Sequence, residues 1–359
     1  MKKIGIMTTG GDCSGLNATI IRLVSGGLRR GYQMFGILDG TDGLIENPPA
    51  VIQFDDNLPS PEYIRMSGSF LKNGNATAEN FNTAARAGKL EEFQNKIKKS
   101  IKKLNLDALV LIGGNGSLSL AHNNREVYSN VQLVCIPKTI DMDIPLTDRT
   151  IGFDTAVQSL TEFCDQLMQT ARSHHRWFVV QAMGRDTGHL ALHAGIATGA
   201  SAILIPEIKF SIDSLTEHIK NYSRDYGIII VAEGIKLRGH SGKAADMIAR
   251  ELTKKGFAVR TAFPEHIQRV GDTTAADRIL ASRFADVALD SIANNETYVM
   301  TALINRVVKS VSLTEMFLAG EISQDPNIID LSVSNSFVPL NSPLLSAAVS
   351  MGTYVGEMK

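Results

Sequence analysis

Two carboxylates follow an apolar run in the middle of the chain, in the segment Pro137-Lys138-Thr139-Ile140-Asp141-Met142-Asp143. The preceding residues 132–136 predict a buried strand, so Asp141 and Asp143 are expected just beyond a strand end. Ligands of open α/β sheets bind outside the carboxyl ends of the strands. A carboxylate there can take the proton of a substrate hydroxyl, and a second can help to hold a metal ion. In isolation, the same residues are equally compatible with a solvated acidic turn.

Two glycine-rich segments each join an expected strand to an expected helix. They are Thr9-Gly10-Gly11-Asp12-Cys13-Ser14-Gly15 and Gly113-Gly114-Asn115-Gly116-Ser117. Glycine lets backbone N–H groups approach a phosphate, and a helix N-terminus adds partial positive charge. Neither segment is a Walker A or a G-x-G-x-x-G motif, and each alone is also compatible with a tight turn. Together they predict a polyphosphate site where the strand order reverses.

Charged residues follow two further expected strands. Arg185, in Met183-Gly184-Arg185-Asp186-Thr187-Gly188-His189, is suited to stabilising charge on a transferring phosphoryl group. Glu233, after the apolar run 228–231, is suited to binding sugar hydroxyls. The remaining candidate cations for a phosphate are Arg176, Arg260, His266 and Arg269. For each of these residues a surface cap or salt bridge is the competing interpretation.

The elements that must position these residues alternate along the chain. Apolar runs predict strands at 3–8, 33–38, 108–112, 132–136, 177–183, 202–205, 227–232, 259–263 and 298–304. Helical periodicity predicts helices at 15–30, 90–104, 118–128, 154–173, 188–198, 213–226, 243–255, 273–294 and 343–354, the last with Ser342 as its N-cap. This alternation implies an α/β fold of two doubly wound, mostly parallel units, with the active site in the cleft between them.

The composition is typical of a globular enzyme and argues against a nucleic-acid or membrane partner. The 359 residues carry 36 Lys and Arg against 37 Asp and Glu, so the net charge of -1 provides no global basic field. No stretch approaches 18 uninterrupted apolar residues, and the first apolar run stops at Thr8, too early for a signal peptide. The three widely spaced cysteines suit a reducing compartment, so we expect a cytoplasmic protein.

The ordered set of motifs resembles the phosphofructokinase family over about residues 2–310. The matching segments are Gly-Gly-Asp and Gly-Leu-Asn near the N-terminus, Gly-Gly-Asn-Gly-Ser, Pro-Lys-Thr-Ile-Asp-Met-Asp, Thr150-Ile151-Gly152-Phe153-Asp154-Thr155-Ala156, Met-Gly-Arg, Glu-Gly and His-Ile-Gln-Arg. The resemblance implies phosphoryl transfer to the 1-hydroxyl of fructose 6-phosphate, giving fructose 1,6-bisphosphate in glycolysis. It also implies Mg²⁺ as the cofactor.

The resemblance assigns a role to each matching residue. Asp141 becomes the base, Thr139 lies at the transferring phosphate, and Arg185 faces the developing charge. Asp143 and Asn115 become candidates for the metal site. The implied sugar-phosphate site contains Thr139, Asp141, Arg176, Met183, Gly184, Arg185, Glu233, Arg260, His266 and Arg269. The implied donor site contains Gly11, Lys72, Gly114, Asn115, Gly116, Ser117 and Lys138.

The order of the expected elements suggests boundaries near 141–152 and near 305, and the resemblance implies what each part binds and how copies assemble. We expect residues 1–140, part of 152–172 and the C-terminal region to form a donor-binding unit. Residues from about 141 to 305 are expected to bind the sugar phosphate, and 318–359 to form a C-terminal extension. In the family, the cations that match Arg176 and Arg260 come from a neighbouring subunit. The expected state is therefore a homo-oligomer, a dimer or a tetramer with shared active sites.

Two positions bear on the phosphoryl donor and point in different directions. Glycine at position 116 resembles ATP-dependent members, because it leaves room for the α-phosphate that an aspartate would exclude. Lys138 resembles pyrophosphate-dependent members, since many bacterial ATP-dependent members carry glycine there. A lysine can coexist with ATP, so ATP is the favoured donor, and a pyrophosphate-dependent phosphotransferase is the alternative.

Several departures from the family pattern keep other functions open. Asn115 stands where an acidic residue usually lies near Mg²⁺, Thr41 replaces an aromatic that flanks adenine, and Asn75 replaces an arginine that reaches the donor phosphates, a role that Lys72 can take over. These changes leave the alternative of a non-catalytic paralogue that binds sugar phosphates. Sedoheptulose 7-phosphate is a further possible acceptor, because the same phosphate and hydroxyl contacts would serve it.

Overall fold

The alternating strands and helices form two units, and each unit is built around its own sheet. The structure, a computed structural model, describes residues 1–55, 61–74, 77–237, 241–324 and 337–357. The chain divides into two units. Unit 1 comprises Met1–Thr139, Ile144–Gly152 and Gly271–Ser334, and unit 2 comprises Ile140–Asp143, Phe153–Val270 and Asn335–Lys359. Both units are α/β with mostly parallel sheets, which confirms the expected fold class.

Unit 1 is built on a seven-stranded sheet. In spatial order its strands are β11 (Val307–Ser312), β10 (Val299–Ile304), β5 (Gln132–Pro137), β4 (Ala108–Gly113), β1 (Lys3–Thr8), β2 (Gln33–Ile37) and β3 (Val51–Phe54). The five inner strands run parallel, and the two edge strands run antiparallel to their neighbours. Every residue of β4 is buried, which explains its uninterrupted apolar sequence.

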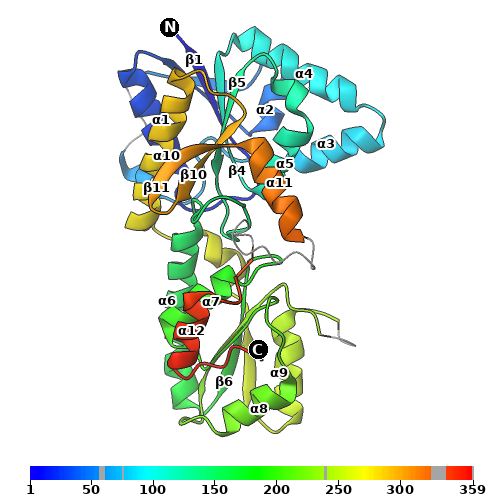
Figure 1. Cartoon of the computed structure of the whole chain (residues 1–359), viewed down its shortest axis with the longest axis vertical. Helices are drawn as coiled ribbons and strands as arrows, with labels where there is room; N and C mark the ends of the chain where they lie inside the picture. The colour runs from blue at the N-terminus through cyan, green and yellow to red at the C-terminus, as the bar shows by residue number, and fades with distance from the viewer. Residues whose placement is uncertain (56–60, 75–76, 238–240, 325–336, 358–359) are drawn as a thin grey trace. The chain divides into compact units, whose positions relative to one another are not determined.

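Helices cover both faces of this sheet (Figure 1). On one face α1 (Leu16–Arg29) packs beside α10 (Ala275–Ala293). On the other face α4 (Leu90–Leu104), α5 (Asn115–Asn123) and α11 (Leu313–Gln324) share one apolar core with the strands. The remaining elements of unit 1 are α2 (Thr41–Ile45), α3 (Thr77–Arg86) and the 3₁₀ turns η1 (Pro61–Ile64) and η2 (Arg125–Tyr128).

Unit 2 has a four-stranded, fully parallel sheet. In spatial order its strands are β7 (Ala202–Leu204), β8 (Gly227–Ala232), β6 (Trp177–Ala182) and β9 (Val259–Ala262). Helices α8 (Ile212–Lys220) and α9 (Ala244–Lys254) close one core, while α6 (Phe153–Ser173) and α7 (His189–Thr198) pack on the opposite face. The 3₁₀ turn η3 (Glu265–Arg269) contacts α6, and the last helix, α12 (Pro343–Ser350), contacts α7.

The C-terminal segment, residues 337–357, pairs with the edge of the unit 2 sheet. Tyr354 forms a parallel bridge with Ala202 of β7, where the Ile203 N–H donates to the Tyr354 carbonyl over 2.8 Å. The segment therefore covers backbone groups that an open edge would expose. Helix α12 begins after its Ser342 N-cap, as the sequence predicts. It ends earlier than expected, because Gly352 takes a positive φ of 78° that stops the helix.

The unit boundaries differ from the expected ones at several places. Residues 144–152 lie in unit 1 and not with the sugar-phosphate unit, and residues 337–357 of the C-terminal region lie in unit 2. Helix α6 lies wholly in unit 2, whereas part of residues 152–172 was expected in the donor-binding unit. Residues 271–305 lie in unit 1 and not with the sugar-phosphate unit. The reason is packing that local patterns do not report: α10 lies against α1, and β10 pairs in parallel with β5.

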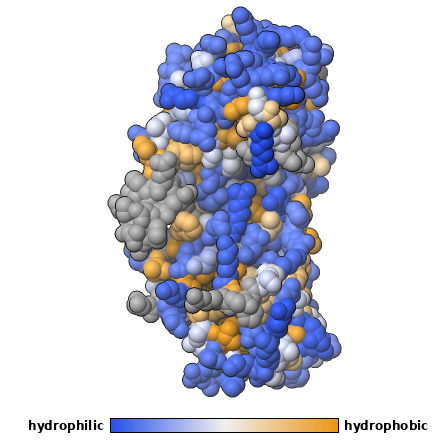
Figure 2. All heavy atoms as spheres, turned by 90° about the vertical axis from the view of Figure 1, so that its right-hand side faces the viewer, coloured by the Kyte–Doolittle hydropathy of each residue, from blue (hydrophilic) through white to orange (hydrophobic). Residues whose placement is uncertain are grey.

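The surface is polar over most of the face that Figure 2 presents, and its apolar atoms lie in scattered patches. Large exposed apolar side chains do occur in the C-terminal segment, at Phe337, Leu340, Val349 and Met351. No helix within the described ranges is long and apolar enough to cross a bilayer.

Candidate active site

The two glycine-rich turns of unit 1 lie side by side. They follow β1 and β4, which are adjacent parallel strands with Thr8 paired to Ile112. A Cβ on Gly113 would lie 2.9 Å from Oγ1 of Thr9, and one on Gly10 would lie 3.2 Å from Oγ of Ser117. Only glycine allows the turns to approach so closely. The predicted pairing of the two turns is thus realised in the fold.

Lys138 crosses this pair of turns from the end of β5. Its backbone N–H donates to the Gly113 carbonyl over 2.9 Å, and its Nζ donates to the Gly11 carbonyl. The residue is only 3% exposed, so its charge is held inside the turn region of unit 1. A buried ammonium beside glycine turns suits an anionic ligand.

The remaining donor-site candidates of unit 1 lie in α5 and next to the end of β1. Asn115 and Gly116 form the first turn of α5, whose N-terminus carries partial positive charge. A Cβ on Gly116 would meet no atom within 4 Å, so the space beside this residue is open. Lys72 is exposed, and its carbonyl accepts a 2.7 Å hydrogen bond from Oγ1 of Thr8 at the end of β1.

Thr41 and Asn75 stand at positions where the family pattern has other residues. Thr41 is buried at the start of α2, directly after β2 and the Asp39–Gly40 turn. Asn75 lies outside the described residues. Thr139 ends the unit 1 segment, where its carbonyl accepts a 2.7 Å hydrogen bond from Oγ1 of Thr150.

In unit 2 the two carboxylates and Arg185 come together. Nε of Arg185 lies 3.6 Å from Oδ2 of Asp141, and its Nη1 lies 3.8 Å from Oδ2 of Asp143. The two carboxylate side chains are each only 12% exposed, whereas the arginine is 63% exposed. The site therefore pairs two shielded carboxylates with a cation that solvent or a ligand can reach.

The environment of Asp141 tunes its proton affinity. Burial raises the pKa of this carboxyl to about 6, with smaller increases from Asp143 and Glu233. The nearby Arg185 and Arg269 oppose the increase. A carboxylate with such a pKa is ionised at neutral pH, yet it binds a proton more strongly than an ordinary aspartate. That property suits a general base.

The loop from Met183 to Gly188 is held by acceptors from other elements of unit 2. Glu233, at the end of β8, accepts the N–H groups of Gly184 and Arg185 through Oε1, over 3.1 and 2.8 Å. Gln268 in η3 accepts the Met183 N–H through Oε1 over 3.0 Å. Glu233 was expected to bind sugar hydroxyls, and what the structure shows is that its Oε1 fixes the backbone that carries Arg185.

Thr187 joins this loop to the segment that carries the carboxylates. Its Oγ1 contacts the carbonyls of Asp141 and Gly184, over 2.8 and 3.1 Å. Sequence reasoning missed the positioning roles of Thr187 and Gln268. Both lie inside motifs that had been singled out, but only the tertiary fold reveals their partners.

The cations expected at the sugar phosphate separate into two groups. His266 and Arg269 lie in η3, and Arg269 is close enough to lower the pKa of Asp141. Arg176 precedes β6, and Arg260 is the second residue of β9, so both lie near the amino ends of parallel strands. Met183 and Glu233 follow the carboxyl ends of β6 and β8. Unit 2 therefore does not bring Arg176 and Arg260 to the Asp141 site of the same chain.

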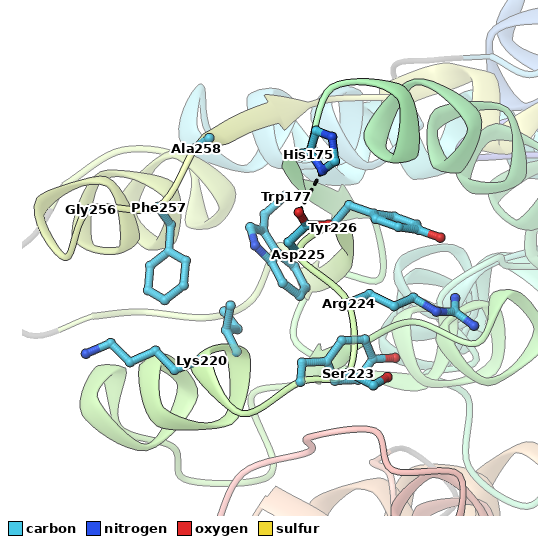
Figure 3. A pocket seen from close by; sticks show the side chains of 12 residues that line it. His175, Trp177, Lys220, Ser223, Arg224, Asp225, Tyr226, Gly256, Phe257 and Ala258 are labelled. Carbon is cyan, nitrogen blue, oxygen red and sulfur yellow. Dashed lines mark hydrogen bonds and ion pairs between the residues drawn. The ribbon is translucent and has the colours of Figure 1, made fainter.

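Two pockets of unit 2 mark the two ends of its sheet. One of about 550 Å³ adjoins Arg185 and Glu233 and is also lined by Lys236 and Lys243. The other, of about 670 Å³, lies beside Arg176 and is lined by aromatic residues that include Trp177, Tyr222 and Phe257. Figure 3 shows His175 directed at Asp225 on its wall, with a 2.6 Å contact between Nδ1 and Oδ2.

The expected metal-site residues provide only part of the oxygen ligands that a Mg²⁺ ion needs. In the described residues no group of three or more His, Cys, Asp or Glu could hold a metal ion. Asp143 and Asn115, the two expected candidates, belong to units 2 and 1 respectively. One carboxylate and one amide oxygen fit Mg²⁺, which usually keeps waters and binds through substrate phosphates instead of a complete protein cage.

The chain resembles phosphofructokinases over nearly its whole length. It is 38% identical to ATP-dependent 6-phosphofructokinase 1 of Nostoc sp. over 373 residues, covering 99% of both chains. It is 37% identical to ATP-dependent 6-phosphofructokinase of Halothermothrix orenii over 325 residues, covering 88% of this chain and 94% of that one.

Solved structures agree on the fold. The phosphofructokinase of Saccharomyces cerevisiae superposes with a TM-score of 0.79 at 25% identity, and the match covers 98% of this chain but 48% of the yeast chain. A pyrophosphate-dependent phosphofructokinase of Marinobacter aquaeolei gives a TM-score of 0.76 at 15% identity, which supports the fold alone. Residues 3–292 match the family described as Phosphofructokinase, and the chain belongs to this family.

Proposed function

We propose that this protein transfers the γ-phosphoryl group of ATP to the 1-hydroxyl of fructose 6-phosphate, giving fructose 1,6-bisphosphate and ADP in glycolysis. The observation that carries the proposal is the contact between Arg185 and the buried Asp141, whose pKa is about 6. A base and a charge-stabilising cation at one point are what phosphoryl transfer to an alcohol requires. A cytoplasmic location goes with this glycolytic role.

The proposed reaction uses this chain's residues as follows. Asp141 accepts the proton of the 1-hydroxyl as the sugar oxygen attacks the γ-phosphorus. The bond to the bridging oxygen then breaks, and ADP leaves with its electron pair. Arg185 stabilises the charge on the transferring group, which Thr139 also contacts. Catalysis rests mainly on positioning and electrostatics, as for other phosphoryl transfers.

The proposed donor site lies at the glycine turns of unit 1. Backbone groups of Gly11, Gly114 and Gly116, with Ser117, would cradle the phosphates, while Lys138 and Lys72 supply positive charge. The open space beside Gly116 favours ATP over pyrophosphate, since it can take the α-phosphate. Relatives named as ATP-dependent at 38% and 37% identity support the same choice. The buried Lys138 keeps pyrophosphate as the second candidate donor.

Magnesium would enter with the donor. Asp143 and Asn115 are the residues proposed to hold it. When bound, the ion would neutralise charge on the donor phosphates.

The sugar phosphate would be held by both groups of cations. Within one chain it would be bound by the cations His266 and Arg269, together with Met183, Gly184 and Glu233. Arg176 and Arg260, near the opposite end of the sheet, would reach the site of a neighbouring copy. The protein is therefore proposed to act as a homo-oligomer, a dimer or a tetramer.

The test of the activity is a side-by-side rate measurement with ATP and with pyrophosphate, at fixed Mg²⁺ and saturating fructose 6-phosphate. We expect turnover with ATP to exceed turnover with pyrophosphate. Faster turnover with pyrophosphate would show that pyrophosphate, and not ATP, is the donor. Binding of the sugar phosphate with no turnover from either donor would favour a non-catalytic paralogue. Competition by sedoheptulose 7-phosphate would report the breadth of the acceptor site.

The shared active site can be tested by mixing two inactive variants. Asp141→Asn removes the base, and Arg260→Ala removes the cation that a neighbour would receive. Dissociation and reassembly of a mixture should restore part of the activity, because some sites then combine two intact contributions. If the mixture is no more active than the two parents, Arg260 does not act across subunits.

A further inference from the structure

Glu207 holds the end of the Arg185 loop from a part of unit 2 that the catalytic motifs do not include. It follows β7 and reaches back to the start of α7. Its Oε1 accepts the Gly188 N–H over 2.8 Å and the Val338 N–H over 3.1 Å. Its Oε2 is buried and has no hydrogen-bond partner among the described residues. This carboxylate is therefore directed into the protein and not toward solvent.

Gly188 is the point at which the loop becomes a helix. It is the N-cap of α7 and, as a glycine, supplies no side-chain cap. Glu207 accepts the N–H of the N-cap residue itself, as the glutamate of a capping box does, and its carboxylate lies at the helix N-terminus, where an acidic group is favoured. A Cβ on Gly188 would lie 2.6 Å from Oε2 of Glu207, so the two residues also fit closely.

Carboxylates fix the loop at both of its ends. Glu233 binds the N–H groups of Gly184 and Arg185, and Glu207 binds that of Gly188. Between them Thr187 contacts the Asp141 carbonyl. Arg185 itself takes a positive φ of 51°, which a non-glycine residue keeps only when its surroundings enforce it. Both contacts are thus part of what holds Arg185 in that conformation.

The C-terminal segment holds Glu207 from the other side. Val338 is buried and donates its N–H to the same Oε1 that receives Gly188. The segment is anchored farther along by the buried Leu345 of α12 and by the Tyr354 bridge to β7. Burial raises the pKa of Glu207, while the N–H donors of Gly188 and Val338 lower it.

We propose that Glu207 is a positioning residue for Arg185, and that the C-terminal segment keeps it in place through the Val338 N–H. The proposal rests on the proposed phosphoryl transfer, in which Arg185 stabilises the transferring group. Glu207 touches neither substrate, and it acts through the backbone of the loop.

Three variants separate this role from ordinary stabilisation. Glu207→Ala removes the acceptor, and we expect kcat to fall about 10- to 100-fold, with a smaller change in KM for fructose 6-phosphate. Glu207→Gln keeps an acceptor oxygen and should restore kcat to within about threefold. Ser211→Ala is the matched control, because its Oγ caps α8 in the same unit through Ser214 and makes no hydrogen bond to the loop among the described residues. It should lower the melting temperature without lowering kcat.

A double-mutant cycle tests whether Glu207 acts through Arg185. In an Arg185→Ala background, adding Glu207→Ala should change kcat by less than about threefold, because the group it positions is already absent. If the two losses multiply, or if Glu207→Ala alone leaves kcat unchanged, the positioning role is wrong. Val338→Pro removes the second N–H, together with the buried valine side chain, and leaves the Gly188 N–H in place. An unchanged kcat in this variant would show that the C-terminal segment has no part in positioning Arg185.

Amide hydrogen exchange gives a readout that does not need turnover. In Glu207→Ala, exchange at Gly188 and across 183–187 should accelerate, while Ser211→Ala should leave these amides unchanged. Should the wild-type protein show no activity with fructose 6-phosphate, the proposed reaction fails and this exchange result still decides whether Glu207 fixes the loop. Unchanged exchange in Glu207→Ala would overturn the inference whatever the activity.

Discussion

Arg185 places its Nε 3.6 Å from Oδ2 of Asp141, a buried carboxylate, while remaining 63% exposed itself. At this distance the two groups influence each other electrostatically without a short, locking hydrogen bond. The cation limits the rise in the pKa of the base, and part of its guanidinium stays open to a ligand. One residue can therefore serve both the base and the transferring group.

Replacing Asp141 by Asn should abolish most of the turnover. The amide has nearly the same shape but cannot take the hydroxyl proton, so we expect kcat to fall by about 10²- to 10⁴-fold. Binding of fructose 6-phosphate, measured by calorimetry, should survive. Asp290→Asn, which removes only an exposed partner of Arg30, is the control and should keep full activity. Near-normal turnover of Asp141→Asn would show that another group is the base.

The rate should depend on pH through the same carboxyl. Because the pKa of Asp141 is raised to about 6, kcat/KM should fall about tenfold per unit as the pH drops below about 6. Initial rates between about pH 5 and 8 measure this limb, with the pKa of fructose 6-phosphate accounted for. A profile that stays flat to pH 5 would contradict the assignment.

The same carboxyl should make the rate rise with pH but the free energy of unfolding fall with pH. Its folded pKa lies above the ordinary value of 3.8, so the folded state binds more protons than the unfolded state between these values. Its contribution to the free energy of unfolding therefore decreases as the pH rises from about 4 to 6. Asp141→Asn should consequently melt at a higher temperature than the wild type at pH 7.5, even though it is less active.

Replacing Gly116 by Asp should suppress the use of ATP. The new carboxylate would occupy the open space beside α5 and repel a donor phosphate. We expect kcat/KM for ATP to fall at least tenfold, with little change in melting temperature, because nothing lies within 4 Å of an added Cβ. Gly116→Ala is the control for backbone effects. Unchanged ATP kinetics in Gly116→Asp would mean that the donor does not lie against this turn.

Replacing Thr187 by Val should disturb both the fold and the reaction. The variant loses the hydroxyl that contacts the carbonyls of Asp141 and Gly184. The Gly184 carbonyl still accepts the backbone N–H of residue 187, so the loss falls mainly on the Asp141 carbonyl, and we expect a cost of about 1–3 kcal/mol in the free energy of unfolding. It should also lower kcat, since the hydroxyl joins the Arg185 loop to the segment of the base. Thr187→Ser keeps the hydroxyl and should behave nearly as the wild type. Equal kcat values for Thr187→Val and Thr187→Ser would show that the Thr187 hydroxyl does not contribute to catalysis.

Sequence alone predicts the elements that carry the candidate residues. The strand 3–8 is found as β1, and the strand 227–232 as β8, because a short, mainly apolar run next to turn residues is typical of a buried strand. The glycine turns were also predictable, since each glycine-rich segment lies between an expected strand and an expected helix. These local signals suffice to place Asp141 and Glu233 near strand ends.

The remainder depends on tertiary contacts that no local pattern encodes. The antiparallel strand β11 was not predicted, because its polar alternation is weak without knowledge of β10 beside it. Helix α8 ends at Lys220 and not at 226, as the chain turns there toward β8. Likewise, the contact of Glu207 with Gly188 joins residues 19 positions apart, and nothing in the sequence near Glu207 suggests it.

The most direct test of the account is a crystal structure of the protein with fructose 6-phosphate bound. We predict that the oxygen of its 1-hydroxyl lies within hydrogen-bond distance of the Asp141 carboxylate, with the 6-phosphate bound by His266, Arg269 and the partner subunit. A sugar phosphate bound elsewhere, or one whose 1-hydroxyl points away from Asp141, would contradict the proposed reaction.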